Sequence, residues 1–373
     1  MKNKFYICTS LLFFLVFYKT NLDSHKLINH KIQNLQFVAN LDGNEILKNV
    51  NLALNNKKLG ITDKSFLWFG RKKPTPLDKI NSENPALANL WKSTSMMFGA
   101  AADGVGFGTS FAIKKSDDGK MLFLTNFHVV EQFCKIPEDA IADFSNNDDT
   151  KYACQALFVL HDIAINTNTN IASIDGELPF KSEVNSLLYF DKEKDLAVFK
   201  INMPADNNIE VATIEKSYDL NGLFIMAKNA EKNDPNLLPD VVNGIKMYPV
   251  TAFTLYLAAY SIPKPEEQTN PELAWIKKHW FKGKTEGIQT FENEKKLGFV
   301  NAFKHDIEVV PGTSGAAMAL SDGRVIGINT CIETKQFYAK HGILWWKKDV
   351  LETYKSNFAM PSLFLNDFFD KLN

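Results

Sequence analysis

The stretch Val310-Pro311-Gly312-Thr313-Ser314-Gly315-Ala316 places one serine between two glycines, two positions before it and one position after it. Gly312 lets the backbone bend so that its own amide N–H and that of Ser314 converge on one point. Two convergent N–H groups stabilise the negative charge that develops on a carbonyl oxygen under nucleophilic attack. Gly315 would leave room for a substrate beside the hydroxyl. Because such a sequence also forms ordinary turns, the remaining chain must decide between a nucleophile and a plain loop.

A histidine in a suitable setting lies upstream of this serine. The apolar run Met121–Val130 predicts a buried strand that ends in a polar step before His128. An imidazole held by packed backbone at such a point takes up and returns a proton near neutral pH. Among seven histidines, His128 alone combines a strand end with a preceding glycine-rich segment, Gly106–Ile113, which we expect to form a hairpin. We expect His305 and His341 to be solvated.

Five segments resemble, in this order, the trypsin-like serine peptidases, and most closely their bacterial HtrA (Deg) branch. The segments are Gly106–Ile113, Leu124–Val130, Asp195–Ile201, Pro311–Gly315 and Gly323–Thr330. The resemblance covers the chain from about residue 95 to about residue 335. It implies an all-β, chymotrypsin-like fold of two antiparallel six-stranded β-barrels, with a few helices in insertions and at the C-terminus. In this family the histidine and the aspartate come from the first barrel and the serine from the second.

Two aspartates compete for the carboxylate that orients His128 and stabilises its protonated ring. Asp195 opens Asp-Leu-Ala-Val-Phe-Lys-Ile, and Asp162 opens the similar Asp-Ile-Ala-Ile-Asn. Spacing favours Asp162, which lies 34 residues after His128, because the 67 residues to Asp195 are long for this family. Strand quality favours Asp195, since the run Asn-Thr-Asn-Thr-Asn over 166–170 predicts a turn soon after Asp162. We therefore prefer Asp195, which makes residues 134 to about 185 a long insertion.

The resemblance implies a serine endopeptidase that acts on proteins or peptides without a cofactor or a metal. Ser314 would attack the peptide carbonyl, His128 would carry the proton, and the N–H groups of Gly312 and Ser314 would hold the oxyanion of an acyl-enzyme pathway. An extended peptide would add by main-chain hydrogen bonds to one short strand. That strand consists of Gly327, Ile328, Asn329 and Thr330.

Two residues near the serine bear on regulation and specificity. In digestive members of the family an aspartate precedes the serine and binds the N-terminus that zymogen cleavage releases, whereas this chain has Thr313. We therefore expect no activation through that ion pair. Glu308 stands six residues before Ser314, where those enzymes have the floor of the specificity pocket. We favour an exposed loop carboxylate at Glu308 and a preference for small-to-medium apolar side chains.

A second function class stays open beside the peptidase. A catalytically inactive relative could use the same fold and its insertions as a binding module. A lipase or esterase is disfavoured, because Gly312-Thr313-Ser314-Gly315 is not a Gly-x-Ser-x-Gly elbow and the histidine precedes the serine.

Length and charge limit the organisation of the chain. The 373 residues can hold one two-barrel unit of roughly 200 to 250 residues with extensions. The 42 basic and 43 acidic residues give no electrostatic indication of nucleic acid or of an anionic membrane as partner. We expect a leader over 1–24, an N-terminal extension or pro-segment over 25–84 and a peptidase domain over 85–373. Its barrels should span about 100–203 and about 204–345, with short helices within 85–97 and from Pro271, and a C-terminal helix packed on the second barrel.

The N-terminus and the cysteines predict an exported protein. A basic start, Met1-Lys2-Asn3-Lys4, precedes the 14-residue apolar run Phe5–Tyr18, which is typical of a secretion signal. We expect a periplasmic or secreted protein, with an uncleaved membrane anchor as the alternative. In such an oxidising compartment Cys134 and Cys154 could pair and leave Cys331 unpaired. No cysteine or histidine spacing predicts a zinc site.

Overall fold

Two antiparallel sheets carry the residues singled out by the sequence. The structure is a computed structural model, and the chain divides into two units, residues 1–33 with 332–356 and residues 34–331 with 357–373. It describes residues 26–33, 37–38, 41–58, 85–101, 104–116, 118–145, 151–204, 207, 209–215, 218–219, 224–225, 240–242, 245–249, 254–292, 299–341 and 348–372. The predicted leader over 1–24 lies outside these ranges. Within the ranges, no helix is both long and apolar enough to cross a membrane.

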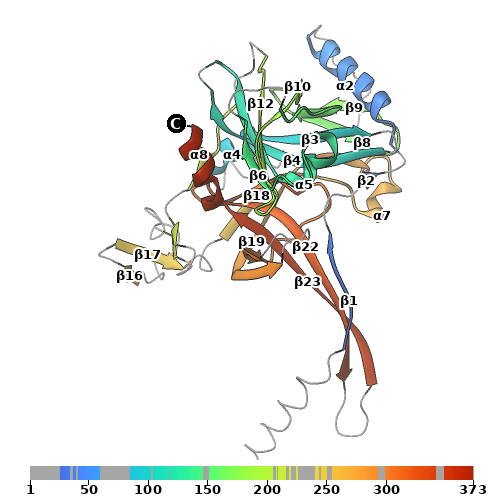
Figure 1. The fold of residues 1–373 in the computed structure, drawn as a ribbon. Coiled ribbons are helices and arrows are strands. Elements are labelled where there is room, and N and C mark those ends of the chain that lie inside the picture. Colours follow the sequence, from blue (N-terminus) through green and yellow to red (C-terminus); the bar gives the residue numbers. More distant parts are fainter. Residues whose placement is uncertain are drawn as a thin grey trace, which may run out of the picture. The chain divides into compact units, whose positions relative to one another are not determined.

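The first sheet holds the segments that carry His128 and Asp195. Eight strands follow the order β10-β7-β3-β4-β5-β12-β11-β6, and β2 pairs with β4 (Figure 1). Their bounds are β2 Phe37–Val38, β3 Thr94–Ala101, β4 Gly104–Lys115, β5 Met121–Thr125, β6 Ala142–Phe144, β7 Leu157–His161, β10 Phe180–Glu183, β11 Leu187–Asp191 and β12 Leu196–Ile201. The apolar run at 121–125 is buried throughout, as predicted, and Phe123 stacks on Phe199 at 5.9 Å between ring centroids. The glycine-rich segment expected to be a hairpin is instead part of the single strand β4.

The second sheet closes on itself and carries the serine turn. Six strands follow the order β18-β21-β22-β23-β20-β19, and β19 pairs back onto β18. Their bounds are β18 Thr254–Ser261, β19 Trp275–Glu292, β20 Phe299–His305, β21 Ala317–Leu320, β22 Arg324–His341 and β23 Lys348–Pro361. A closed antiparallel ring leaves no free edge among its own strands. The predicted all-β, chymotrypsin-like class is confirmed, although the first sheet has nine strands and not six.

Several short strands supplement these two sheets. β1, Lys26–Gln33, runs antiparallel to β22 from the pair Gln33 and Ile332 to the pair Lys26 and Tyr338, within the smaller unit. β13, Thr213–Ile214, pairs in parallel with β22. A separate four-stranded sheet consists of β14 Tyr218–Asp219, β15 Phe224–Ile225, β16 Asp240–Val242 and β17 Ile245–Pro249.

The insertion between His128 and Asp195 is structural. β6, β7 and β10 join the first sheet, while β8, Ile163–Asn166, and β9, Ala172–Ile174, form a hairpin whose first strand pairs with β19. β8 is buried at every residue, so strand quality does not separate Asp162 from Asp195 as the sequence suggested. The polar run supplies the last residue of β8 and the turn after it, where the Asn166 side chain accepts the N–H of Asn168 at 3.0 Å.

Among the described residues before β3 are the two helices α2 and α4. α2, Gly43–Lys58, falls in the region expected to be an extension, and it lies next to β9 (Figure 1). Its Ile46 and Val50 are buried in one core cluster with residues of β3, β7 and β8. α4, Ala88–Ser93, follows the 3₁₀ turn Pro85–Leu87 and ends at the start of β3, four residues before the predicted end.

Two predicted helices differ from the observed ones. The helix expected at Pro271 is wrong, since the chain enters β19 at Trp275 and the short helix α7 is Pro265–Gln268. There the Glu267 carboxylate accepts the N–H of Lys264 at 2.9 Å and caps the first turn. The C-terminal α8, Asn366–Leu372, exists, but its Phe368 ring packs on Phe144 of β6 and Tyr189 of β11. The predicted packing of this helix on the second barrel is therefore wrong. Phe368 packs on the first sheet, because it finds aromatic partners there.

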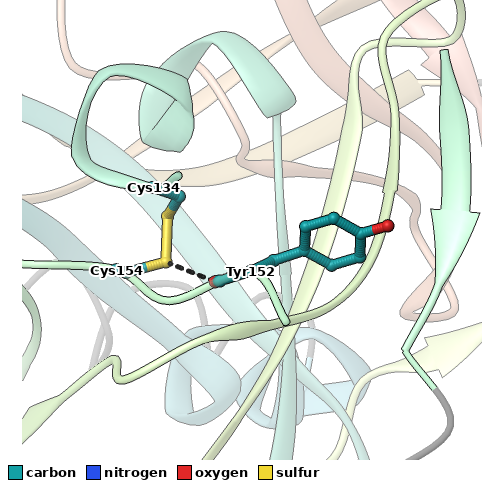
Figure 2. The surroundings of a disulfide bond; sticks show 3 residues. All are labelled: Cys134, Tyr152 and Cys154. Atoms are coloured by element: carbon teal, nitrogen blue, oxygen red, sulfur yellow. Dashed lines mark hydrogen bonds between the residues drawn. A yellow bond between two sulfur atoms is a disulfide. The ribbon is translucent and has the colours of Figure 1, made fainter. Parts of the chain in front are cut away.

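A disulfide anchors the segment that follows His128. Cys134 and Cys154, 20 residues apart, are bonded as the sequence suggested, and Figure 2 shows the bridge beside the helical turns that precede Cys134. Those turns are α5, Phe127–Val130, and the 3₁₀ turn Glu131–Phe133. The bridge ties the end of the His128 segment to the insertion. The side chain of Cys331 lies outside the described residues.

Replacing Cys134 and Cys154 together by alanine is expected to lower the free energy of unfolding by about 3 kcal/mol, because the unfolded chain regains the entropy of a loop of this length. Urea denaturation of the oxidised protein and of the double variant measures the difference. Dithiothreitol should lower the midpoint of the wild type and leave that of the variant unchanged. Equal midpoints without reductant would contradict the expectation.

Candidate active site

The serine turn connects β20 to β21 and bends at its glycines. Gly312 has φ 92° and Gly315 has φ 86°, both in the left-handed region that favours glycine. The N–H of Thr313 donates to Val310 O at 3.2 Å, and the N–H of Ala316 donates to Thr313 O at 3.1 Å. The predicted tight turn around Ser314 is therefore present, and Ser314 is half-buried at its tip.

Two backbone N–H groups of this turn are available for a ligand. The N–H of Ile262 bonds Pro311 O at 2.9 Å, and since C=O and N–H point in opposite directions across a trans peptide, the Gly312 N–H points away from Ile262. In the same way, the groups that donate to Thr313 O, among them the N–H of Ala316, fix the direction of the Ser314 N–H, which belongs to the same peptide group. Within the described part of the chain no acceptor bonds either N–H. An oxyanion can bind where two such donors converge.

Gly315 serves close packing and not an open substrate space. A side-chain carbon there would lie 2.1 Å from Thr109 O of β4 and 2.3 Å from the hydroxyl oxygen of Thr125 of β5. The N–H of Thr109 donates to Ser314 O at 2.8 Å, and its hydroxyl donates to Gly312 O at 2.8 Å. The room predicted beside the hydroxyl is therefore filled by the first sheet. Glycine is needed because two backbones approach each other at this point.

His128 and Asp195 are in contact. His128 lies in α5, directly after β5, and its Nδ1 is 2.8 Å from Asp195 Oδ2. The backbone N–H of His128 donates to Asp195 Oδ1 at 3.0 Å, and the Asn126 amide donates to Asp195 O at 3.0 Å. Asp195 has φ 53°, a left-handed conformation that aspartate tolerates, immediately before β12. With Nδ1 facing a carboxylate, the ring proton lies on Nδ1 and Nε2 is left as the basic nitrogen.

Thr330 connects the serine to the carboxylate. Its hydroxyl donates to Asp195 Oδ2, and its carbonyl accepts the hydroxyl of Ser314 at 3.1 Å. The sequence predicts only a peptide-binding role for Thr330. Its one sequence signal for this second contact is a hydroxyl that follows a buried apolar stretch, Val325 to Ile328. The structure thus brings Ser314, Asp195 and, through Asp195, His128 together around Thr330.

At Asn329, the main-chain groups of the predicted peptide-binding strand are hydrogen-bonded within the protein. The Asn329 N–H donates to Ala316 O at 2.8 Å, and its carbonyl accepts the N–H of Gly315 at 2.8 Å. Gly327 and Ile328 pair with Met318 and Ala317 of β21. The main chain of Asn329 therefore holds the serine turn, and its N–H is not available to a substrate backbone.

The chain is similar to a known protein family in sequence and to a solved structure in fold. A family model described as a trypsin-like peptidase domain matches residues 108–328, more than half of the chain. The chain belongs to the trypsin-like peptidases. A solved structure titled "Crystal structure of Deg5" is similar at 15% identity and a TM-score of 0.39, over 76% of this chain and 89% of that one. A search of curated protein sequences found no match.

In this trypsin-like peptidase, Asp162 has partners other than His128. Its Oδ1 lies 3.1 Å from the Lys278 ammonium of β19 and 3.6 Å from His161 Nε2. Lys278, whose side chain is only 2% exposed, also donates to Trp91 O at 2.9 Å. Asp162 therefore links the β7–β8 connection to β19 and α4, and the orientation of His128 falls to Asp195.

Burial and charge shift the pKa values in this Asp162 cluster. Burial lowers the pKa of the Lys278 ammonium. Burial by itself raises the pKa of Asp162, but Lys278, His161 and the N–H of Leu178 together bring it below its ordinary value. The pKa of His161 falls from 6.5 to about 3, mainly through burial and secondly through Lys278. At neutral pH the cluster thus holds one buried ion pair beside a neutral imidazole.

Two further predictions near the serine have opposite outcomes. The Glu308 side chain is 80% exposed and pairs with Lys264 at 2.9 Å, which fits the expected loop carboxylate. His305, expected to be solvated, is only 2% exposed because β20 packs it into the second barrel. The side chain of His341 lies outside the described residues.

Among the described side chains, no cluster of histidine, cysteine and carboxylate groups could hold a metal ion.

Asp162→Asn is expected to lower the free energy of unfolding by about 3 to 5 kcal/mol, because Lys278 is left buried without its counter-ion. The double variant Asp162→Asn with Lys278→Met should recover most of that loss, since no buried charge remains and asparagine tolerates the left-handed backbone at this position, φ 49°. Urea denaturation measures all three proteins. Glu308→Gln, at an exposed ion pair, is the matched control and should leave the midpoint unchanged. A silent Asp162→Asn would contradict the assignment.

The buried neutral His161 is expected to make the protein sensitive to acid. The unfolded chain binds a proton below pH 6.5, whereas the folded His161 does so only near a pKa of about 3. The contribution of His161 to stability is complete above pH 6.5 and is lost as the pH falls, by about 1.4 kcal/mol per pH unit. Midpoints of urea denaturation between pH 7 and about 4.5 should fall less steeply for His161→Gln than for the wild type. Parallel curves would remove this explanation.

Proposed function

We propose that the protein is a serine endopeptidase that cleaves peptide bonds through an acyl-enzyme on Ser314. One observation carries the proposal. The Asp195 carboxylate bonds both His128 and Thr330, and Thr330 in turn accepts the hydroxyl of Ser314. Membership of the trypsin-like peptidases supports the same reaction class. In that reading the nucleophile, the base and the orienting carboxylate are Ser314, His128 and Asp195.

The first half of the reaction forms the acyl-enzyme. The Ser314 proton leaves its bond to Thr330 O and moves to Nε2 of His128, while the serine oxygen attacks the substrate carbonyl carbon. The carbonyl oxygen becomes an oxyanion between the N–H groups of Gly312 and Ser314. Collapse of this intermediate breaks the C–N bond, and the leaving amine takes the proton from His128. A water molecule then repeats the sequence and releases the acid and free Ser314.

Asp195 supplies orientation and charge to this sequence. Its Oδ2 lies 2.8 Å from Nδ1 of His128 and holds the ring proton there, so Nε2 carries no proton and can act as the base. When the ring becomes positively charged, the carboxylate stabilises it. The bond from the His128 backbone N–H at 3.0 Å and the Thr330 hydroxyl fix both carboxylate oxygens. No metal or cofactor is assigned a step.

Proteins or peptides are the proposed substrates. Glu308 is 80% exposed and paired with Lys264, so a buried carboxylate for lysine or arginine is not the basis of side-chain choice. We therefore keep the preference for small-to-medium apolar side chains next to the cut bond. Export to the periplasm or beyond is proposed as well. The basic and apolar start over residues 1–18 and the Cys134–Cys154 disulfide support it.

A second candidate function is a catalytically inactive binding module. One observation favours it, namely that the Ser314 hydroxyl donates to Thr330 O, a bond that must break before attack. A folded wild-type protein that neither reacts with an acylating probe nor cleaves a peptide library would support this candidate.

Ser314 is expected to react with a fluorophosphonate probe, and mass spectrometry of the labelled peptide would locate the adduct. Ser314→Ala should abolish labelling, and Asp195→Asn should lower kcat on a library-derived peptide by about 10⁴-fold, because the ring of His128 loses its orienting carboxylate. Asp162→Asn is the matched aspartate control and should retain kcat per folded molecule. Loss of activity in Asp162→Asn with full activity in Asp195→Asn would reverse the assignment.

A further inference from the structure

Asn329 of β22 holds the serine turn through hydrogen bonds. This residue is 2% exposed, and its main chain bonds Gly315 and Ala316, which follow Ser314. Its side-chain Nδ2 donates to Thr313 O at 3.1 Å and approaches the Thr313 hydroxyl at 3.2 Å. Asn329 therefore hydrogen-bonds to the residues before and after Ser314 and forms no hydrogen bond with Ser314 itself.

The hydrogen bond from Asn329 Nδ2 to Thr313 O sets the direction of the Ser314 N–H. Thr313 O and the N–H of Ser314 belong to one planar peptide group and point in opposite directions. A donor that fixes the oxygen therefore also fixes the N–H. That N–H is one of the two proposed donors to the oxyanion, and such donors act only when they are held in place before the charge forms.

The side-chain amide of Asn329 must be held the right way round. Its Nδ2 faces Thr313, and a flipped amide would put Oδ1 against Thr313 O, with two acceptors facing each other. Asn329 Oδ1 is buried and, within the described residues, accepts no hydrogen bond of standard geometry, and the two ring nitrogens of His305 likewise have no partner of standard geometry. The ring of His305 lies against the Asn329 side chain and the backbone of Phe358. His305 is itself 2% exposed.

The surroundings of His305 suit a neutral donor. Burial, the largest cause, lowers the pKa of His305 to about 4, against weaker opposing effects of Phe358, Asn329, Asp306 and Glu286. At neutral pH the ring therefore carries one N–H and one bare nitrogen. The Oδ1 of Asn329 is a buried acceptor beside it, and a buried acceptor is costly to leave unpaired.

We propose that His305 and Asn329 are positioning residues for the oxyanion donors, with His305 keeping Nδ2 of Asn329 turned toward Thr313 and Asn329 aiming the N–H of Ser314. The proposal rests on the proposed peptidase function. It assigns a role in transition-state binding to two residues that contact neither substrate nor the reacting atoms.

Kinetics of four variants test the proposal. Asn329→Asp keeps the shape but turns the donor into an acceptor, and we expect kcat to fall about 10²-fold to 10³-fold with KM little changed. His305→Leu removes the ring donor and should lower kcat about tenfold or more. His305→Gln restores an N–H donor and should recover most of that loss. His279→Leu, at a half-buried histidine of β19, is the matched control and should leave kcat unchanged.

A transition-state readout separates positioning from simple destabilisation. A peptide aldehyde forms a tetrahedral adduct with the serine, so its inhibition constant should rise by the same factor as kcat/KM falls in each variant. All values are taken per folded molecule, as measured by circular dichroism. Asn329→Asp with wild-type kcat, or His305→Gln as impaired as His305→Leu, would overturn the proposal.

An activity-independent measurement keeps this outcome distinct from failure of the peptidase assignment. In protein labelled with ¹⁵N-serine, the amide resonance of Ser314 is identified by its loss in Ser314→Ala. Asn329→Asp and His305→Leu should shift this resonance, whereas His279→Leu should not. An unmoved Ser314 resonance would overturn the positioning role even in an active enzyme. A shifted resonance in a protein that cleaves nothing would retain the positioning role and remove the peptidase.

Discussion

The carboxylate of Asp195 is the interaction on which the site depends. A partly buried carboxylate is stable only when its oxygens are hydrogen-bonded, and here the donors are the backbone and ring of His128 and the hydroxyl of Thr330. These donors come from α5, which follows the first sheet, and from β22 of the second, so satisfying one carboxylate joins the two halves. Thr109 adds a second connection through its bonds to Ser314 O and Gly312 O. The two halves of the trypsin-like peptidase therefore meet through polar groups with defined directions, which fixes orientation as well as distance.

Local chemistry in the sequence predicted the parts of the site that short-range geometry controls. The bend at Gly312, the buried run before His128 and the strand after Asp195 each follow from a few neighbouring residues. The two aspartates could not be separated in this way, because both have a left-handed backbone, φ 49° and 53°, and both open a buried strand. What distinguishes them is Lys278, 116 residues from Asp162, and no local pattern carries that information.

The other predictions that the structure corrects also failed because they depend on contacts between residues far apart in the sequence. Gly315 was read as open space because the partner that fills it, Thr109, lies in another sheet. His305 was read as solvated from its charged neighbours along the chain, although its strand turns the ring into the barrel core. α8 was assigned to the wrong sheet because aromatic residues specify burial without naming the partner. The role of Asn329 in holding the serine turn was missed for the same reason, since a strand asparagine shows its target only in three dimensions.

The separation of these contacts along the chain also governs when the site can exist. The bond from Thr109 to Gly312 spans 203 residues, and that from Thr330 to Asp195 spans 135. Contacts this remote form late in folding, because the entropy of closing large loops must be overcome first. A ribosome-bound chain carries the imidazole and the carboxylate well before the serine emerges. Any hydrolytic capacity therefore arises only after the segment with Ser314 and Thr330 has been made, and the growing polypeptide is inert toward its neighbours until then.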